Sequence, residues 1–305
     1  MKAIMLAAGE GTRCYPFTYL SPKIAQEVCG IPLLEYMLSW FAGAPEIEKL
    51  YIAVRNDSIA ETVENYLDKR EEHLPRIMDL FDRLGFQVIN SNPDLRTEVI
   101  KVKGWGTGGD LRLAINQIDL DQESGEDILV CNADYVIARK LHNGKLSPQL
   151  DLSNIISYHQ EAKEAFGVAM TDALMPVRRE EATRFGVAQL DPPKADAVGG
   201  RSFSLVRGFT EKPELEEVPE NPSINAGVYI IDADMLMANL DEFLPEKPGT
   251  NLEKTLLERL ASEEQSRLAG YPLDLEAWFD VGTLEQLVEV SRFIARGGLG
   301  EGLQR

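Results

Sequence analysis

Short apolar runs alternate with stretches that are apolar at helical spacing through the first half of the chain. Lys2 to Ala7 is an apolar run that ends in Ala8-Gly9-Glu10-Gly11, which predicts a buried strand leading into a tight loop. Leu33 to Phe41 is apolar at helical spacing and predicts a helix. The same criteria predict strands at 49–54, 86–90, 98–102 and 127–132, and helices at 58–84, broken near Pro75, and at 110–117. This alternation is typical of a mostly parallel, doubly wound sheet.

The pattern changes after residue 154, where strand-like runs are divided by turn-rich segments. Strands are predicted at 155–160, 186–190, 204–210, 228–231 and 277–281, and helices at 251–261 and 284–294. Residues 191–201 read as a loop inside a hairpin, and 214–222 as an acidic, Pro-rich surface loop. We therefore expect an α/β fold with a Rossmann-like, doubly wound mixed sheet and a β-rich second portion. A single domain over 1–295 and a flexible Gly-rich tail at 296–305 are expected.

Charge and cysteine content exclude several classes of protein. The chain has 31 basic and 50 acidic residues, a formal net charge of −19. General nucleic-acid binders and anionic-membrane binders need a basic face, so no nucleic-acid or membrane partner is expected. Three cysteines without paired spacing indicate a reducing compartment, and no run is apolar enough for a signal peptide or a membrane span. A cytoplasmic location is the expectation.

The most specific motif follows the first strand. Leu6-Ala7-Ala8-Gly9-Glu10-Gly11-Thr12-Arg13 is followed by Pro16, Thr18, Pro22 and Lys23. Glycines after a strand let backbone amides approach a phosphate closely, and Arg13 and Lys23 would add cationic groups. A Rossmann dinucleotide loop fits poorly, because Cys14 stands where its third glycine belongs and Pro16 would disrupt the helix. A P-loop is excluded because Gly11 is not followed directly by a Lys-Ser or Lys-Thr pair.

Further motifs follow in order along the chain. They are Gly106-Thr107-Gly108-Gly109, Asn132-Ala133-Asp134, Phe185-Gly186-Val187, Glu211-Lys212-Pro213, Asn225-Ala226-Gly227 and Trp278-Phe279-Asp280-Val281-Gly282-Thr283. Together with the opening loop, this series resembles the sugar-1-phosphate nucleotidyltransferases, or NDP-sugar pyrophosphorylases, from Met1 to about Val290. The chain departs from that family's pattern in Ile24 to Val28, in Ala133 and Asp110, and in the longer helical stretch at 58–84.

The resemblance implies a function for each motif. Leu6, Ala7, Ala8, Gly9, Gly11, Thr12, Gly106, Thr107 and Gly108 would bind the nucleotide, and Arg13 and Lys23 would be catalytic. Asp134 and Asp280 would hold Mg²⁺, and Gly186, Glu211, Lys212 and Asn225 would bind the sugar phosphate. The first half, 1–150, would bind mainly the nucleotide, and 151–295 mainly the sugar. Two carboxylates together with phosphate oxygens suit the coordination that Mg²⁺ prefers.

Each motif also has a structural alternative. Asp134 and Asp280 are expected to be helix caps or turn residues if they hold no metal. Glu211 and Lys212 would then form a surface ion pair, Asn225 a turn, and Gly186 an edge-strand position. The glycines at 106–109 would be a helix entry.

The expected reaction is in-line attack of a sugar 1-phosphate on the α-phosphorus of a nucleoside triphosphate, with release of pyrophosphate. The attacking oxygen is already anionic, so positioning and charge stabilisation are the main requirements. The competing class is a non-catalytic regulatory relative that binds sugar nucleotides. A dinucleotide-dependent oxidoreductase fits the loop less well. The base, which can be that of UTP, dTTP or GTP, and the sugar stay open, and a homo-oligomer is possible.

Overall fold

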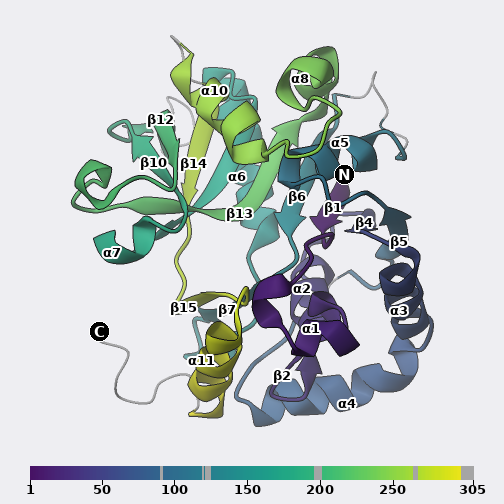
Figure 1. Cartoon of the computed structure of the whole chain (residues 1–305). Helices are drawn as coiled ribbons and strands as arrows, with labels where there is room; N and C mark the ends of the chain where they lie inside the picture. Colours follow the sequence, from purple (N-terminus) through teal and green to yellow (C-terminus); the bar gives the residue numbers. More distant parts are fainter. Residues whose placement is uncertain (90–91, 119, 121–124, 196–200, 264–266, 297–305) are drawn as a thin grey trace. The chain divides into compact units, whose positions relative to one another are not determined.

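The computed structural model of the chain (Figure 1) describes residues 1–89, 92–118, 120, 125–195, 201–263 and 267–296. The chain folds into two compact units that interleave along the sequence. Unit 1 is formed by Met1–Leu6, Val102–Cys131 and Ser153–Asp274, and unit 2 by Ala7–Lys101, Asn132–Leu152 and Leu275–Arg305. The assignment of 1–150 to the nucleotide and 151–295 to the sugar stays a prediction.

Unit 1 is built on a mixed sheet whose strands follow the order β10-β12-β14-β9-β13-β6-β1, with β11 paired to β12. β14 and β9 are parallel, whereas β13 is antiparallel to both β9 and β6. The elements of unit 1 are β1 (Lys2–Leu6), α5 (Thr107–Ile115), β6 (Asp127–Asn132), α6 (Leu152–Phe166), β9 (Met170–Pro176), α7 (Arg179–Ala182), β10 (Gly186–Leu190), β11 (Lys194–Ala195), β12 (Ser202–Glu211), η3 (Leu215–Glu217), β13 (Ser223–Asp232), α8 (Ala233–Ala238), α9 (Leu240–Phe243), η4 (Glu253–Leu257), α10 (Glu258–Ser262) and β14 (Leu268–Pro272).

Both faces of this sheet are covered, which explains why β13 is buried along nearly its whole length. On one face, Nδ1 of His159 in α6 lies 2.9 Å from the hydroxyl of Thr171 in β9. Side chains alternate along a strand, so the next residue, Asp172, points to the opposite face, where Glu253 of η4 is close enough to act on its carboxyl group. The sheet is thus enclosed by helices on both sides, as a buried mixed sheet requires.

Unit 2 combines a parallel strand pair with helices and two small antiparallel sheets. β4 pairs with β5 in parallel, β15-β7-β8 form one small sheet, and β2-β3 form another. Its core gathers apolar side chains from α2, α4, β7 and α11, including Tyr36, Phe81, Val136 and Val290. The elements of unit 2 are η1 (Thr12–Cys14), α1 (Phe17–Leu20), η2 (Lys23–Ala25), β2 (Glu27–Val28), β3 (Ile31–Pro32), α2 (Leu33–Ala42), β4 (Lys49–Val54), α3 (Asp57–Asp68), α4 (Arg70–Arg83), β5 (Arg96–Lys101), β7 (Tyr135–Lys140), β8 (Leu146–Ser147), β15 (Ala277–Asp280) and α11 (Leu284–Ala295).

The expected α/β class with a mixed sheet is confirmed, and so are most individual elements. The strand predicted at 155–160 is wrong, because these residues lie within α6. Leu152, Ile155, Ile156, His159 and Ala162 are buried, which is the spacing of a helix face. The β-branched Ile155 and Ile156 favoured a strand locally, but the helical period of the buried positions over α6 determines the structure.

The two helices predicted within 58–84 are confirmed, but their break lies at Lys69 and not near Pro75. α3 ends before Lys69 and α4 begins at Arg70, so that Pro75 lies inside α4. The guanidinium of Arg70 makes two hydrogen bonds, of 2.7 and 3.0 Å, to the buried carboxylate of Glu35 in α2. This bidentate pair attaches the first residue of α4 to α2.

Two other expectations concern segments that the structure describes only in part. Of the strand predicted at 86–90, Phe86 forms an isolated bridge, residues 87–89 are not in a strand, and Asn90 lies outside the described residues. The hairpin around 191–201 is confirmed by the pairing of Lys194 with Phe203, although 196–200 lie outside the described residues. The tail from 297 also lies outside them. Among the helices that the structure describes, none has both the length and the apolar composition to cross a membrane.

Candidate active site

The predicted phosphate loop leaves the end of β1 and is fixed at both of its ends. Leu6 is the last residue of β1, and the N–H of Ala7 donates to the carbonyl of Ala53 at 2.8 Å. At the other end, the hydroxyl of Thr18 donates to the carbonyl of Gly11 at 2.7 Å. Gly11 has φ of 64°, and a Cβ there would lie 2.9 Å from the Thr18 side chain. The loop therefore needs glycine at position 11 for its conformation and for its close contact with Thr18.

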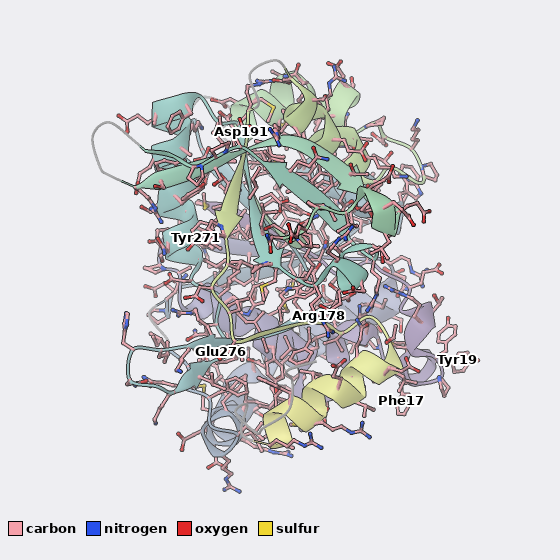
Figure 2. All side chains as sticks on the ribbon, turned by 90° about the vertical axis from the view of Figure 1, so that its left-hand side faces the viewer. Phe17, Tyr19, Arg178, Asp191, Tyr271 and Glu276 are labelled. Carbon is pink, nitrogen blue, oxygen red and sulfur yellow. The ribbon has the colours of Figure 1, made fainter. Side chains whose placement is uncertain are left out.

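The short helix α1 contributes little burial to this region. Its Phe17 and Tyr19 side chains are 51% and 82% exposed and project away from the unit (Figure 2). The contribution of α1 to the loop is therefore the Thr18 hydrogen bond rather than apolar packing. Arg13 and Lys23 lie on either side of α1, in the short helices η1 and η2.

Arg13 and Asp280 both lie against Gly282. Their Nη2 and Oδ1 atoms lie 3.1 and 2.9 Å from the point that a Cβ of residue 282 would occupy. The Cys14 thiol donates to the carbonyl of Gly282 at 3.3 Å and so joins η1 to the end of β15. A side chain at position 282 would displace both charged groups, which explains why glycine suits this position.

Lys23 and Asp134 form a close ion pair, with 2.6 Å between Nζ and Oδ2. The N–H of Val281 donates to the carbonyl of Asp134 at 2.8 Å, and Asp280 pairs with Tyr135 in the small sheet. Residues far apart in sequence, Lys23, Asp134 and Asp280, are thus brought together within unit 2. The other Asp134 oxygen, Oδ1, is buried and accepts no hydrogen bond from the residues that the structure describes.

The alternative in which Asp280 caps the next helix is excluded. α11 begins after Thr283, and the Thr283 side chain accepts a hydrogen bond from the N–H of Gln286 at 3.3 Å. Asp134 stands between β6 and β7 rather than at a helix start. The carboxylates of Asp134 and Asp280 therefore do not serve as helix caps.

The pKa of the Cys14 thiol is influenced by the same four charged side chains. Burial raises the pKa of the Cys14 thiol, while Lys23 and Arg13 act to lower it and Asp280 and Asp134 act to raise it. The net direction is upward, so the thiol stays protonated near neutral pH. Cys14 is therefore a packing residue in this cluster rather than an activated nucleophile.

The donor chemistry of this cluster fits Mg²⁺. Asp134 and Asp280 supply hard carboxylate oxygens, one of them buried without a hydrogen bond from the described residues. No group of three or more His, Cys, Asp or Glu side chains that could hold a metal occurs in the described part of the chain. Two carboxylates completed by substrate phosphates and water are a usual Mg²⁺ environment, so the residues present suit that ion.

The Gly106-Thr107-Gly108-Gly109 segment of unit 1 forms the start of α5 and packs closely on the loop before η4. The N–H groups of Gly108 and Gly109 each donate to the carbonyl of Thr250 at 3.1 Å. A Cβ at Gly106 or Gly108 would lie 2.7 or 2.8 Å from Thr250 atoms. These glycines permit close backbone packing, and their contact with a nucleotide stays a prediction.

Asp110, a departure from the family pattern, has a local structural reason. Its Oδ1 accepts a hydrogen bond from the N–H of Trp105 at 2.9 Å. The carboxylate therefore fixes the turn that leads into α5, where an acidic side chain is also favoured by the helix dipole.

The predicted sugar-binding residues lie together on neighbouring strands of unit 1. Gly186 in β10 pairs with Glu211 in β12, and Val187 pairs with Ile224, next to Asn225 in β13. Glu211 is only 10% exposed, and its Oε1 lies 3.3 Å from Nζ of Lys212, which is 64% exposed. This pair differs from a simple surface ion pair because the Glu211 side chain is largely shielded from solvent.

Asn225 uses its amide within its own strand. Its Oδ1 accepts from the N–H of Gly227 at 2.6 Å, and its Nδ2 donates to the hydroxyl of Tyr229 at 2.7 Å. The side chain thus shapes an irregularity in β13, where the register with β9 shifts between Asn225 and Tyr229. Its contact with a sugar stays a prediction.

Gly186→Ala is expected to disturb the pairing of β10 with β12, where the predicted sugar-binding residues lie. The new Cβ would lie 2.2 Å from Cζ of the buried Phe209 ring and 2.9 Å from Oε2 of Glu211. We expect a loss of about 1–3 kcal/mol in the free energy of unfolding, with a raised KM for sugar 1-phosphate. The matched control is Gly208→Ala, whose Cβ meets only the flexible Gln189 side chain. Equal effects of the two substitutions on unfolding and KM would contradict this explanation.

A buried acidic pair beside these strands was not predicted from the sequence. Asp172 in β9 is 0% exposed and Glu253 in η4 is 8% exposed. Neither carboxylate oxygen of Asp172 has a hydrogen-bond partner in the described part of the chain. The available signal was an aspartate inside an otherwise apolar run, Met170-Thr171-Asp172-Ala173-Leu174, but β9 was not predicted.

Asp172→Asn is expected to stabilise the protein at neutral and alkaline pH. Burial, and then the nearby Glu253, raise the pKa of Asp172 well above its usual value. The folded state therefore holds this proton after the unfolded chain has released it, so the wild-type protein loses stability as pH rises from about 4 toward the folded pKa. At pH 8 the variant should gain at least about 1 kcal/mol in denaturant unfolding, and the gain should vanish near pH 4. A difference that does not depend on pH would contradict the assignment.

Comparison with known proteins identifies the family of the chain. The family model described as nucleotidyl transferase matches residues 2–297. A probable mannose-1-phosphate guanylyltransferase 2 of Oryza sativa subsp. japonica is 27% identical over 92% of this chain and 61% of its own length. A bifunctional protein GlmU of Methanococcus maripaludis is 26% identical over 92% of this chain and 51% of its length. The chain thus spans between half and two thirds of the length of these relatives.

Solved structures share the fold at lower identity. A UDP-glucose pyrophosphorylase complexed with UDP-glucose has a TM-score of 0.70 at 19% identity, covering 97% of this chain and 98% of that one. A putative glucose-1-phosphate thymidylyltransferase from Bacillus anthracis, in complex with a sucrose, has a TM-score of 0.66 at 17% identity, covering 96% and 95%. The family match extends over residues 2–297, nearly the whole length of the chain. The chain belongs to the nucleotidyl transferase family.

Proposed function

We propose that this chain condenses a nucleoside triphosphate with a sugar 1-phosphate to give an NDP-sugar and pyrophosphate. The observation that carries the proposal is the cluster in unit 2, where Lys23 is ion-paired to Asp134 and Arg13 lies with Asp280 against Gly282. Two cations and two carboxylates gathered beside a glycine loop suit the binding of a metal-complexed polyphosphate.

The reaction requires no general base. A phosphate oxygen of the sugar 1-phosphate forms a bond to the α-phosphorus, and the bond from that phosphorus to the bridging oxygen of pyrophosphate breaks. The attacking oxygen is an anion, so no proton has to be removed. The barrier arises from bringing two polyanions together and from charge that develops on the transferring phosphoryl group.

The residues of unit 2 are assigned to the triphosphate. The amides of the 7–12 loop would bind its phosphate oxygens, and Arg13 would stabilise the leaving pyrophosphate. Lys23 would stabilise the transferring phosphoryl group, and Asp134 would orient the Lys23 ammonium through their 2.6 Å contact. Asp134 and Asp280 would hold Mg²⁺, which when bound supplies positive charge to phosphate oxygens.

The residues of unit 1 are assigned to the base and the sugar. Gly106, Thr107 and Gly108 would lie against the nucleotide, and Gly186, Glu211 and Asn225 would bind the sugar hydroxyls. Lys212, which is 64% exposed, would bind the phosphate of the sugar. The names of the relatives and structural neighbours suggest a hexose 1-phosphate, and GTP, UTP or dTTP as nucleotide.

The test is release of pyrophosphate in the presence of Mg²⁺, with common nucleoside triphosphates screened against a panel of sugar 1-phosphates. Release that needs one triphosphate and one sugar 1-phosphate together would support the proposal and identify both substrates. Folded protein that binds a nucleotide but releases pyrophosphate with no pair would favour a regulatory sugar-nucleotide-binding protein instead.

A further inference from the structure

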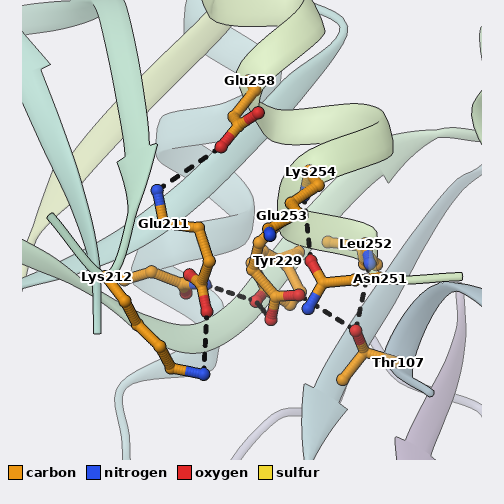
Figure 3. Close-up of polar contacts among 10 residues, drawn as sticks. Thr107, Glu211, Lys212, Tyr229, Asn251, Leu252, Glu253, Lys254 and Glu258 are labelled. Carbon is orange, nitrogen blue, oxygen red and sulfur yellow. Dashed lines mark hydrogen bonds and ion pairs between the residues drawn. The ribbon is translucent and has the colours of Figure 1, made fainter. Parts of the chain in front are cut away.

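A chain of hydrogen bonds in unit 1 connects the start of α5 to the sugar-side strand β13 through Glu253 (Figure 3). The Thr107 hydroxyl donates to Oε2 of Glu253 at 3.0 Å, and the Tyr229 hydroxyl donates to Oε1 at 3.5 Å. The Tyr229 oxygen in turn accepts from Nδ2 of Asn225 at 2.7 Å. One carboxylate therefore contacts both the segment assigned to the nucleotide and the strand assigned to the sugar.

The backbone around Glu253 is arranged to present this carboxylate. Glu253 begins η4, a five-residue π-helical segment, and π-helical turns are concentrated at functional sites. Just before it, the N–H of Leu252 donates to the Thr107 hydroxyl at 3.0 Å. Thr107 thus receives one hydrogen bond and gives another, both within two consecutive residues of the η4 start. This reciprocal pair holds α5 and η4 in one register.

A carboxylate at this position is not explained by stability. Glu253 is 8% exposed, and burial raises its pKa, with Glu211 adding to the rise and the Thr107 hydrogen bond and Lys212 opposing it. Asp172, opposite Tyr229 in the sheet, is a second buried acid on the same face. Buried acids that repel each other cost free energy that apolar residues of similar size would not. Groups kept at such a cost are most often functional.

We propose that Glu253 is a positioning residue that couples the nucleotide-side turn at Thr107 to the sugar-side pair Tyr229 and Asn225. The proposal rests on the function proposed above. When a nucleotide orders Thr107, the Glu253 carboxylate is fixed, and through it the Tyr229 hydroxyl and the Asn225 amide take the orientation that binds the sugar. The coupling is reciprocal, so a bound sugar phosphate likewise favours the nucleotide-bound orientation of Thr107.

The coupling is tested with a double-mutant cycle on the complete chain, using the substrate pair identified by pyrophosphate release. Thr107→Val removes the donor to Glu253 and is expected to raise the KM of the sugar 1-phosphate about fivefold or more, although Thr107 is assigned to the other substrate. In a Glu253→Leu background, Thr107→Val should raise that KM no further. Additive effects on the sugar KM would overturn the proposal.

Two further variants separate positioning from folding. Glu253→Gln keeps an acceptor for Thr107 and a polar contact for Tyr229, so it should retain KM values within about twofold of the wild type, whereas Glu253→Leu raises both by fivefold or more. Glu216→Leu, at an exposed glutamate of the same unit, is the matched control and should change neither. Thermal unfolding shows whether each variant is folded. Equal KM values for Glu253→Leu and the wild type would reject the positioning role, while an inactive wild type would reject the proposed function instead.

Discussion

Lys23→Ala is expected to lower turnover by about a hundredfold or more, the typical loss for one donor to a transition-state charge. The Lys23 ammonium lies 2.6 Å from Asp134 and is 16% exposed, so its position is held by a partner rather than by solvent. Such a preorganised charge loses little free energy in reorienting when the phosphoryl group transfers. The loss should appear in kcat more than in KM, because charge develops mainly in the transition state.

The measurement is steady-state pyrophosphate release by Lys23→Ala, Lys23→Arg and the control Lys145→Ala. Lys145 is an exposed lysine of the same unit, and its removal should leave turnover unchanged. Lys23→Arg keeps the charge but changes its geometry, so we expect an intermediate loss. Removing Lys23 also leaves Asp134 without its cation, so unfolding must be measured in parallel. A folded Lys23→Ala enzyme with near-normal turnover would refute the assigned role.

Asp280→Asn is expected to raise the Mg²⁺ concentration needed for half-maximal activity by about tenfold or more. Loss of a residue that only supports a metal ligand already lowers metal affinity by about that factor. The substitution keeps the shape of the side chain that lies against Gly282 but removes its negative charge. An amide oxygen is a weaker ligand for a hard cation than a carboxylate. Asp134 remains, so activity should recover in part at high Mg²⁺.

The matched control is Asp68→Asn, at an exposed aspartate near the end of α3. Calorimetric titration of Mg²⁺ into each protein with a bound nucleotide gives a readout that is independent of turnover. An unchanged Mg²⁺ requirement in folded Asp280→Asn protein would show that the paired carboxylates do not hold the metal.

Much of the candidate site could be predicted from the sequence because its segments are local. Glycines that directly follow an apolar run predict a tight loop after β1, and the structure adds that Thr18 holds Gly11 in place. The rule that ligands lie beyond the carboxyl ends of strands supported a site at Asp134, whereas only the resemblance to the NDP-sugar pyrophosphorylases implied that Asp280 faces it. In the structure, Asp280 at the end of β15 pairs with Tyr135, the residue that follows Asp134.

Interactions between distant residues could not be predicted in the same way. No local sequence pattern predicts that Lys23 forms an ion pair with Asp134, which is 111 positions away. The hydrogen bond between Thr107 and Glu253, which are 146 positions apart, is equally unpredictable from a local pattern. Asp172 was missed because a single acid in an apolar run has no period, and its burial is decided by helices on both faces of the sheet. The helix α6 was predicted as a strand because Ile155 and Ile156 are β-branched, whereas the helical period appears only over the whole length of α6.

The most direct test of the central claim follows the α-phosphorus of the nucleotide. Enzyme, Mg²⁺ and triphosphate labelled with ³²P at the α-position are incubated with and without the sugar 1-phosphate identified in the screen, and the products are separated by chromatography. Label is expected to enter an NDP-sugar only when the sugar 1-phosphate is present, with one pyrophosphate released for each NDP-sugar formed. Label that stays in the triphosphate, or that appears as nucleoside monophosphate whether or not the sugar phosphate is present, would contradict the proposed transfer.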